Sequence, residues 1–167
     1  ATLARTLEAQ MPILERKLEF DWYHAVHPAL MLTLRVQGRQ VVPFNLKLDA
    51  KQRFLVISGP NAGGKSVTLK TFGIIQYMTQ CGLLPTLHDN SHIGIVDSIF
   101  IDIGDQQSIE NDLSTYSSHL RSMKLFIRNA NASSLVLIDE IGSGTEPQIG
   151  SALAQAILAR LGKSGCY

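Results

Sequence analysis

Apolar residues along this chain change their spacing several times, and each spacing predicts a different element. Near the N-terminus, apolar positions recur every three or four residues, which predicts a helix over residues 1–18 that Pro12 kinks or splits. From Leu30 to Leu48 the apolar positions alternate about a turn at Gln37-Gly38, which predicts two antiparallel strands. The continuous apolar run 54–57 is typical of a strand buried on both faces.

The second half of the chain alternates between strand-like and helix-like segments. Helical spacing covers 65–81, 114–129 and 148–161, a strand-rich stretch covers 93–103, and 135–138 is a second continuous apolar run. Strands that alternate with helices favour an α/β fold with a mostly parallel sheet flanked by helices. The alternating segment upstream then becomes an antiparallel β attachment at the front of that sheet.

Composition limits the size and the setting of the protein. The chain has 167 residues, 45% of them apolar and 17% charged, which suits one domain with a sizeable core. Its formal net charge of +1 gives no strong field for nucleic acid or membrane. Cys81 and Cys166 have no metal-like spacing and indicate neither a disulfide scaffold nor a zinc site, so we expect a reducing, cytoplasmic setting. No apolar run approaches the roughly 20 residues of a transmembrane helix, so we expect no membrane partner.

The strongest chemical signal is a glycine-rich segment after the first continuous apolar run. Gly59-Pro60-Asn61-Ala62-Gly63-Gly64-Lys65-Ser66 matches G-x-x-x-x-G-K-[ST] at every fixed position. Glycines let backbone N–H groups surround a phosphate, and the helix expected from Lys65 adds its N-terminal dipole. Lys65 supplies a point charge to the terminal phosphates, and the Ser66 hydroxyl suits Mg²⁺. We therefore predict that residues 59–66, with Val67, bind ATP and Mg²⁺.

Two carboxylates follow the second continuous apolar run. Asp139 and Glu140 stand directly after 135–138, at the edge of a parallel sheet where ligands bind. Asp139 is suited to hold Mg²⁺ through its water shell, and Glu140 to orient or deprotonate the attacking water. A solvated acidic turn is the plainer interpretation of such a pair, but the phosphate loop upstream favours the catalytic one.

Three other segments are open to more than one interpretation. Ser114 is an ordinary N-cap for the helix that follows it, or it holds the γ-phosphate of a nucleotide bound by a second subunit. Asp105 and Gln106 lie in a solvated turn, or one of them reaches the metal or the water. Residues 142–147 connect a strand to a helix, or they make a contact across a dimer.

These segments together resemble the MutS family of DNA-processing ATPases, which are relatives of the ABC-type ATPases. The phosphate loop is similar to the MutS version, including Pro60 and Asn61, and Leu113-Ser114-Thr115-Tyr116 resembles the family signature. His27-Pro28 and Val42-Pro43 are similar to two further family marks. Segments 100–109 and 114–120 look closest to the bacterial MutS-two branch.

The resemblance implies a P-loop ATPase that works as a homodimer with two nucleotides sandwiched head to tail. Glu140 and Lys65 would then act in catalysis, and Ser114 would act in trans on the partner's nucleotide. Nucleotide state would control a clamp on branched or mismatched DNA, in recombination suppression or in a process like mismatch repair. Residues 1–20 would be a connecting helix from a missing domain. Residues 21–167 would be an ATPase domain that stops before the family's Thr-Thr-His switch.

Two other functions stay open at this point. The resemblance also extends to proteins that rescue collided ribosomes, so a ribosome-directed ATPase is one alternative. A transporter-type ATP-binding subunit is the other, although it predicts a Leu-Ser-Gly-Gly signature where residues 113–116 read Leu-Ser-Thr-Tyr. The segment 41–45, where the family often contacts adenine, offers only Phe44 as a stacking residue.

Overall fold

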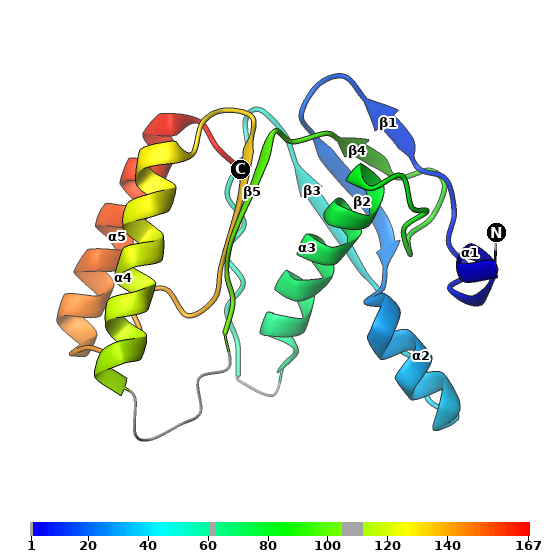
Figure 1. Ribbon diagram of the computed structural model, residues 1–167, viewed down its shortest axis with the longest axis horizontal. Helices are drawn as coiled ribbons and strands as arrows, with labels where there is room; N and C mark the ends of the chain where they lie inside the picture. Colours follow the sequence, from blue (N-terminus) through cyan, green and yellow to red (C-terminus); the bar gives the residue numbers. More distant parts are fainter. Residues whose placement is uncertain (1, 61–62, 105–111) are drawn as a thin grey trace. The chain divides into compact units, whose positions relative to one another are not determined.

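The computed structural model describes residues 2–60, 63–104 and 112–167, and the side chains of 112–115 lie outside that description. The chain divides into two compact units, Ala1–Ile95 and Val96–Tyr167, which are treated separately below. In chain order the elements are α1 (Thr2–Thr6), β1 (Ile13–Glu15), β2 (Phe20–Ala25), α2 (Pro28–Val36), β3 (Phe44–Leu48), α3 (Lys65–Gln80), β4 (His92–Gly94), β5 (Ser98–Asp102), α4 (Asp112–Asn129), β6 (Ser134–Ile138) and α5 (Pro147–Ser164) (Figure 1).

The first unit is a mixed sheet with α3 packed against it. The strand order is β1-β4-β2-β3, with β1 and β4 parallel and β2 antiparallel to both of its neighbours. The ring of Phe72 on α3 meets the rings of Phe20 and Trp22 on β2 edge to face, with centroids 5.2 and 4.6 Å apart. Phe20 and Trp22 are fully buried. This aromatic core fixes the position of α3 on the sheet.

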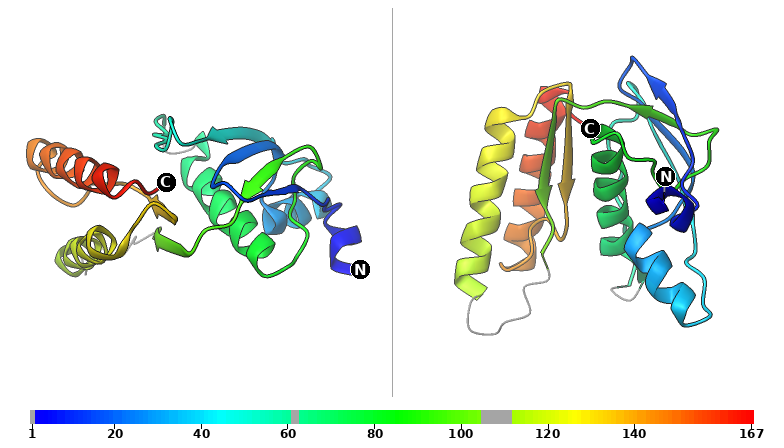
Figure 2. Two further views of the ribbon diagram at one scale, coloured as in Figure 1. Left: turned by 90° about the horizontal axis from the view of Figure 1, so that it is seen from above. Right: turned by 45° about the vertical axis from the view of Figure 1, so that its right-hand side comes forward.

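The second unit is a short parallel sheet covered on one face by two helices. β5 and β6 pair in parallel from Ser98 opposite Ser134 to Asp102 opposite Ile138. Tyr167 extends the sheet beyond β6, because its N–H donates to the Ser134 carbonyl at 3.0 Å and its carbonyl accepts from the Val136 N–H at 2.7 Å. Figure 2 shows α4 and α5 on the same face of this sheet. Buried Met123, Phe126, Ile157, Leu161 and Cys166 form the core between the helices and the strands.

Most elements of the second half confirm the sequence predictions. α3, α4 and α5 occupy the three helical segments with small shifts at their ends, and β6 occupies 135–138. The strand-rich stretch 93–103 holds β4 and β5, which residues 95–97 separate. No helix in the described ranges combines the length and the apolarity needed to cross a membrane.

The prediction of two strands between Leu30 and Leu48 is wrong in its first half, where residues 28–36 form α2. Pro28 opens this helix, where its fixed φ and missing N–H are favourable. The His27 side chain caps it by accepting a hydrogen bond from the Leu30 N–H at 3.3 Å. These start signals and the helix-forming leucines override the alternation. The second half is β3, and its partner is β2 rather than a strand near Leu30.

The predicted helix over the first 20 residues is also wrong beyond Thr6. Residues 13–15 form β1, and the Ile13 N–H donates to the Ser91 carbonyl at 2.8 Å where this strand meets β4. Pro12 cannot continue a helix, so the segment after it is free to pair with a distant strand. Its role as a connection to another domain stays a prediction.

The predicted buried strand at 54–57 is a third correction. Its four residues join neither sheet, and their side chains are 37% to 76% exposed. A strand is stable only when its backbone groups have a partner edge, and no described strand pairs with this segment. The phosphate loop therefore follows an unpaired apolar segment in the described structure.

Candidate functional site

The glycine-rich segment leads directly into the N-terminus of α3. Gly64 is the N-cap in the left-handed backbone region, with φ 79°, where a side chain would be strained. No side chain caps this end of α3. Its first N–H groups and the positive end of its dipole therefore offer a binding position for an anion. Half-buried Ser66 is the second residue of the helix, and the exposed Val67 is the third.

The Lys65 ammonium folds back over the same loop. Its Nζ donates to the carbonyls of Gly59 at 2.7 Å and Pro60 at 2.8 Å. The Gly63 N–H donates to the same Pro60 carbonyl at 2.9 Å, which closes the loop on itself. A fixed positive charge beside a helix N-terminus is the arrangement that phosphate-binding loops use. The first unit therefore supplies a candidate phosphate site from 59, 60 and 63–67.

The acidic pair lies in a pocket of the second unit. Asp139 and Glu140 follow β6, and Asp102 ends the neighbouring β5. The Asp139 N–H donates to the Asp102 carbonyl at 2.9 Å, so the carboxyl ends of the two parallel strands meet at one edge. The pocket is lined by these three residues and by Tyr116, His119, Leu120, Met123, Ile138, Ile141, Gly142, Ser143, Leu153 and Ile157.

The backbone at Glu140 is held in an unusual conformation. Its φ is 50°, in the left-handed region that non-glycine residues seldom occupy. The Ser143 N–H donates to the Glu140 carbonyl at 3.0 Å, and Gly142 supplies the positive φ of 82° at the third position of this turn. Such backbone strain is concentrated at functional sites, because it persists only where the surroundings enforce it.

Two glycines hold the turn after Glu140 against α5. A Cβ placed on Gly142 would overlap the Gly150 carbonyl, and a Cβ placed on Gly150 would overlap the Gly142 carbonyl. The two backbones therefore approach more closely than side chains allow. This contact fixes one wall of the pocket to the first turn of α5.

An imidazole and a third carboxylate, which the sequence argument did not select, complete the pocket. His119 Nδ1 lies 2.6 Å from Asp102 Oδ2, and the two side chains are 22% and 14% exposed. Asp102 stands at the end of β5 as Asp139 stands after β6, and this shared strand-end position is the signal that would have found it. His119 follows Tyr116 and precedes Met123 on the pocket face of α4.

The remaining predicted site residues lie in different units or outside the described residues. The phosphate loop belongs to the first unit and the acidic pair to the second, so their joint action stays a prediction. Asn61, Ala62, Asp105 and Gln106 lie outside the described residues, as does the side chain of Ser114. Residues 142–147 lead from the turn after β6 into the first residue of α5, and their contact across a dimer stays a prediction.

A phosphate loop at a helix N-terminus and carboxylates at the ends of parallel strands are the parts that P-loop nucleotide-binding domains share. The chain belongs to the MutS family: the family model described as MutS domain V, a P-loop ATPase domain, matches residues 55–166. This match covers the phosphate loop from Gly59 onward and the whole acidic pocket.

The similarity extends to curated proteins named Endonuclease MutS2. The chain is 42% identical over 165 residues to the one from Latilactobacillus sakei subsp. sakei (strain 23K), which is 99% of this chain and 20% of the relative. It is 48% identical to the one from Gemmatimonas aurantiaca over 83% of this chain and 16% of the relative. It is 49% identical to the one from Thermomicrobium roseum over 81% of this chain and 18% of the relative. The chain thus spans a fifth or less of the length of these relatives, and these similarities place it with the MutS2 branch of the family.

Proposed function

We propose that this chain binds and hydrolyses ATP as the P-loop domain of a MutS-like dimer. The observation that carries the proposal is that one chain holds two kinds of site. One is a glycine-rich loop at the start of α3 whose carbonyls accept hydrogen bonds from Lys65, and the other is a pocket with carboxylates at the ends of β5 and β6. Membership of the MutS family supports it. We also propose the ABC/MutS-type arrangement of a mostly parallel sheet flanked by helices with an antiparallel β attachment.

The phosphate loop binds the nucleotide in this proposal. Backbone N–H groups of residues 59–66 surround the phosphates, and the α3 dipole favours their negative charge. Lys65 exchanges its two carbonyl acceptors for phosphate oxygens, which are stronger partners for an ammonium group. The exchange needs little rearrangement, because the ammonium already lies over the loop.

The residues present fit a magnesium ion. Mg²⁺ prefers hard oxygen donors and keeps several waters, and Ser66 and Asp139 offer one hydroxyl and one carboxylate. Asp102 is a less suitable ligand, because its carboxylate already contacts His119. Bound Mg²⁺ supplies charge neutralisation at the β- and γ-phosphates.

Glu140 acts on the attacking water. Its carboxylate accepts a hydrogen bond from the water and so orients it, or accepts its proton as the bond to phosphorus forms. The enforced turn from Glu140 to Ser143 holds the backbone that carries this carboxylate. Apolar residues such as Ile141 and Leu153 line the same pocket and limit the number of competing waters.

The second subunit completes the site. Ser114 at the start of α4 would approach the γ-phosphate of the partner's nucleotide, so that hydrolysis depends on dimer closure. A homodimer that closes only with nucleotide couples ATP to the state of a clamp. A role for Asp105 or Gln106 near the metal or water belongs to the same proposal.

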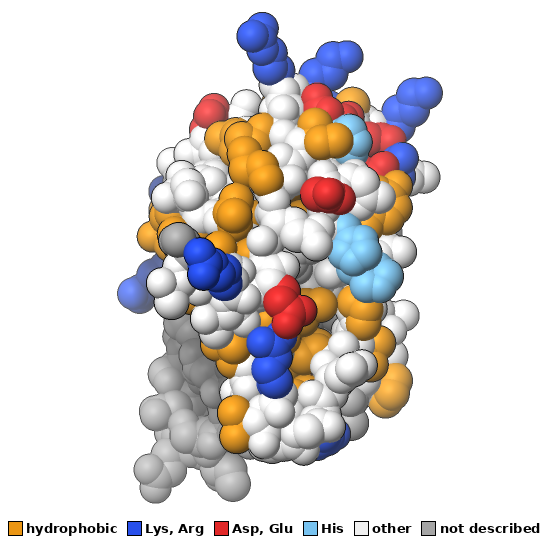
Figure 3. Space-filling view, turned by 90° about the vertical axis from the view of Figure 1, so that its right-hand side faces the viewer, with side chains coloured by type: hydrophobic (Ala, Val, Ile, Leu, Met, Phe, Trp, Pro, Cys, Tyr) orange, Lys and Arg blue, Asp and Glu red, His pale blue; other side chains and the backbone are white. Residues whose placement is uncertain are grey.

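We propose branched or mismatched DNA as the macromolecular partner, bound through parts of the protein outside this chain. The relatives are named as endonucleases, and we assign no DNA cleavage to these residues. On the face shown in Figure 3, basic and acidic side chains are interspersed and do not form a basic stripe. That pattern and the net charge of +1 favour a domain that powers a clamp rather than one that grips DNA.

The deciding experiment measures ATP hydrolysis by the intact protein with a four-way junction, a mismatched duplex, a matched duplex or stalled ribosomes added at one fixed salt concentration. We expect junctions to stimulate turnover more than either duplex. A response to ribosomes alone would replace DNA with the ribosome as partner and leave the nucleotide site unchanged. Absence of ATP hydrolysis under every condition would contradict the proposed function.

A further inference from the structure

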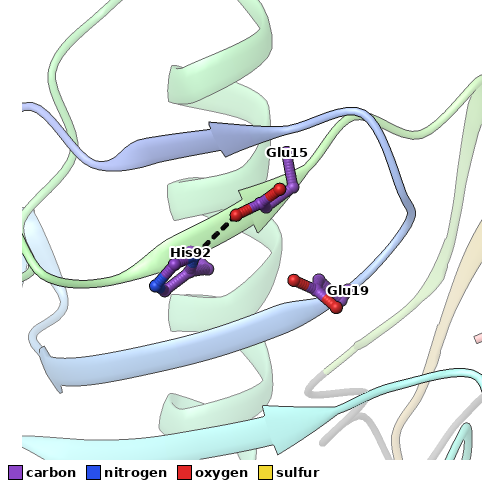
Figure 4. A group of neighbouring side chains, drawn as sticks. All are labelled: Glu15, Glu19 and His92. Atoms are coloured by element: carbon purple, nitrogen blue, oxygen red, sulfur yellow. Dashed lines mark hydrogen bonds and ion pairs between the residues drawn. The ribbon is translucent and has the colours of Figure 1, made fainter.

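A separate group of metal-ligand side chains lies on the first unit. Glu15, Glu19 and His92 each offer one ligand atom, and these atoms all lie within 4.8 Å of one another (Figure 4). Glu15 ends β1, Glu19 directly precedes β2, and His92 begins β4. Segments more than 70 residues apart in the chain thus bring two carboxylate oxygens and one imidazole nitrogen to one place.

The register of the sheet explains why these side chains share a face. β1 and β4 pair with Ile13 opposite His92 and Glu15 opposite Gly94, so Glu15 and His92 project to the same side. Phe20 lies opposite Ile93, and both are fully buried on the other side. Glu19, one residue before Phe20, therefore projects to the side of His92. The convergence follows from strand pairing and not from chance contacts of long side chains.

Gly94 brings the segment that carries Glu19 close to β4. Its N–H donates to the Glu19 carbonyl at 2.7 Å. A Cβ at this position would lie 2.7 Å from backbone atoms of Lys17, Leu18 and Glu19. Any other residue would push this segment away from the strand. The glycine therefore allows the spacing that the three ligand atoms need.

The charges of the cluster are not balanced within it. His92 Nδ1 lies 2.7 Å from Glu15 Oε1. Within the described part of the chain, the Glu19 carboxylate has no hydrogen-bonding or ionic partner. Two carboxylates at this separation repel each other, and a cation between them removes the repulsion. All three residues are half-buried, so an ion can enter from solvent while losing part of its water shell.

We propose that Glu15, Glu19 and His92 bind a divalent transition-metal ion, with Zn²⁺ as the best match. Imidazole is a common ligand of Zn²⁺, whereas Mg²⁺ and Ca²⁺ take oxygen donors. Three protein ligands leave one position for water. The site contains no cysteine, so it is independent of the two thiols in the chain.

Small side-chain movements bring the three atoms to coordination distances. Ligand atoms that bind one ion at about 2.0–2.2 Å lie roughly 3–3.5 Å from each other. The contact between His92 and Glu15 therefore opens slightly, and Glu19 turns towards them. The bound ion ties the segment before β2 to β1 and β4, which stabilises the first unit.

The test is isothermal titration of Zn²⁺ into the metal-stripped intact protein, compared with its His92→Gln and Glu19→Gln variants. We expect each variant to lose one equivalent of bound Zn²⁺ or to bind it at least about tenfold more weakly. His88→Gln and Glu8→Gln are matched controls, because each changes the same residue type elsewhere on the first unit. Both controls should bind Zn²⁺ with the stoichiometry and affinity of the wild type.

Two further readouts separate this site from other zinc-binding groups of the protein. Co²⁺ bound at the site gives a visible d–d absorption band that His92→Gln removes and that Asp139→Asn, in the acidic pocket, retains. Zn²⁺ should also raise the thermal midpoint of the wild type more than that of Glu19→Gln, whose lost carboxylate makes no hydrogen bond to any residue that the structure describes. Equal zinc stoichiometry and affinity in the wild type and in both ligand variants would overturn the proposal.

Discussion

The Nδ1 atom of His119 lies 2.6 Å from Oδ2 of Asp102, and this contact joins α4 to the end of β5. Both residues line the pocket that holds Asp139 and Glu140. The imidazole thus engages one of three neighbouring carboxylates and not the acidic pair, to which we assign magnesium and water in the proposed mechanism. The contact gives His119 a positioning role in the proposed ATPase site.

Replacing His119 with Gln should lower the ATP turnover number roughly tenfold and change the KM for ATP little. The change removes the imidazole partner of the Asp102 carboxylate, which would then compete with the acidic pair for the proposed magnesium ion. Steady-state kinetics over a magnesium titration would measure the effect. The Asp102→Asn variant should restore part of the lost rate when it is combined with His119→Gln. A rise in the KM for ATP with an unchanged turnover number would indicate a role in nucleotide binding instead.

The Glu140→Gln variant should bind ATP normally and hydrolyse it about 10²- to 10⁴-fold more slowly. The amide keeps the size of the side chain and cannot accept the proton of the water. Binding of a fluorescent ATP analogue and release of phosphate would be measured on the same protein. Glu8→Gln, at an exposed position on the first unit, is the matched control and should hydrolyse ATP at the wild-type rate. Wild-type turnover by Glu140→Gln would remove this residue from the mechanism.

The Lys65→Ala variant should lose measurable ATP binding. The ammonium is the side-chain cation that lies over the phosphate loop, and its removal also frees the carbonyls of Gly59 and Pro60. Calorimetric titration with ATP and Mg²⁺ measures the loss. Lys51→Ala, at an exposed position before the loop, should bind as the wild type does. Unchanged affinity in Lys65→Ala would contradict the assignment of the loop.

Helices and strands were predicted correctly where the residues within the segment determine the structure. They were missed where contacts with residues far along the chain determine it. The helix from Lys65 and the strand before Asp139 were predicted because periodicity and flanking residues agree there. The leucines after Pro28 alternate like a strand, and a capping contact from His27 makes them helical. β1 depends on pairing with β4, almost 80 residues away, which no local pattern reveals.

The candidate site shows the same division between local and distant signals. The predicted phosphate loop and acidic pair are contiguous motifs, so both can be recognised from the sequence alone. Asp102 and His119 lie in segments that carry the family resemblance, but no role was predicted for either residue, because their contact depends on how α4 packs on β5. The cluster of Glu15, Glu19 and His92 depends on strand register in the same way.

Gly150→Ala should destabilise the protein by about 1–3 kcal/mol. The added methyl group would overlap the Gly142 carbonyl and force the turn after Glu140 away from α5. Urea denaturation followed by circular dichroism would measure the free energy of unfolding. Ser151→Ala, the exposed neighbour on α5, is the control and should change that energy little. Equal stability of both variants would show that the turn yields without strain.

The stability of the fold should depend on His27 below neutral pH. Burial, and then the positive charge of Lys70, lower the pKa of His27 from its ordinary value of 6.5. The folded state therefore keeps the imidazole neutral, which its capping hydrogen bond from the Leu30 N–H requires. The unfolded chain binds a proton first, so this contribution is present above pH 6.5 and is lost as the pH falls from there towards the lowered pKa.

The check on His27 compares urea midpoints at about pH 7.5 and about pH 5.5 in the wild type and in His27→Asn. Asparagine also caps helices and does not titrate in this range. The variant should therefore lose less stability than the wild type on acidification. An equal loss in both proteins would assign the pH dependence to other groups.

The left-handed backbone at Glu140 has an evolutionary consequence. A residue with a side chain in this region raises the energy of the folded state by about 1 kcal/mol, and glycine avoids most of that strain. Glycine at position 140 would therefore relieve that strain and remove the carboxylate that we propose to act on water. A demand for a robust fold and a demand for turnover would then oppose each other at this residue.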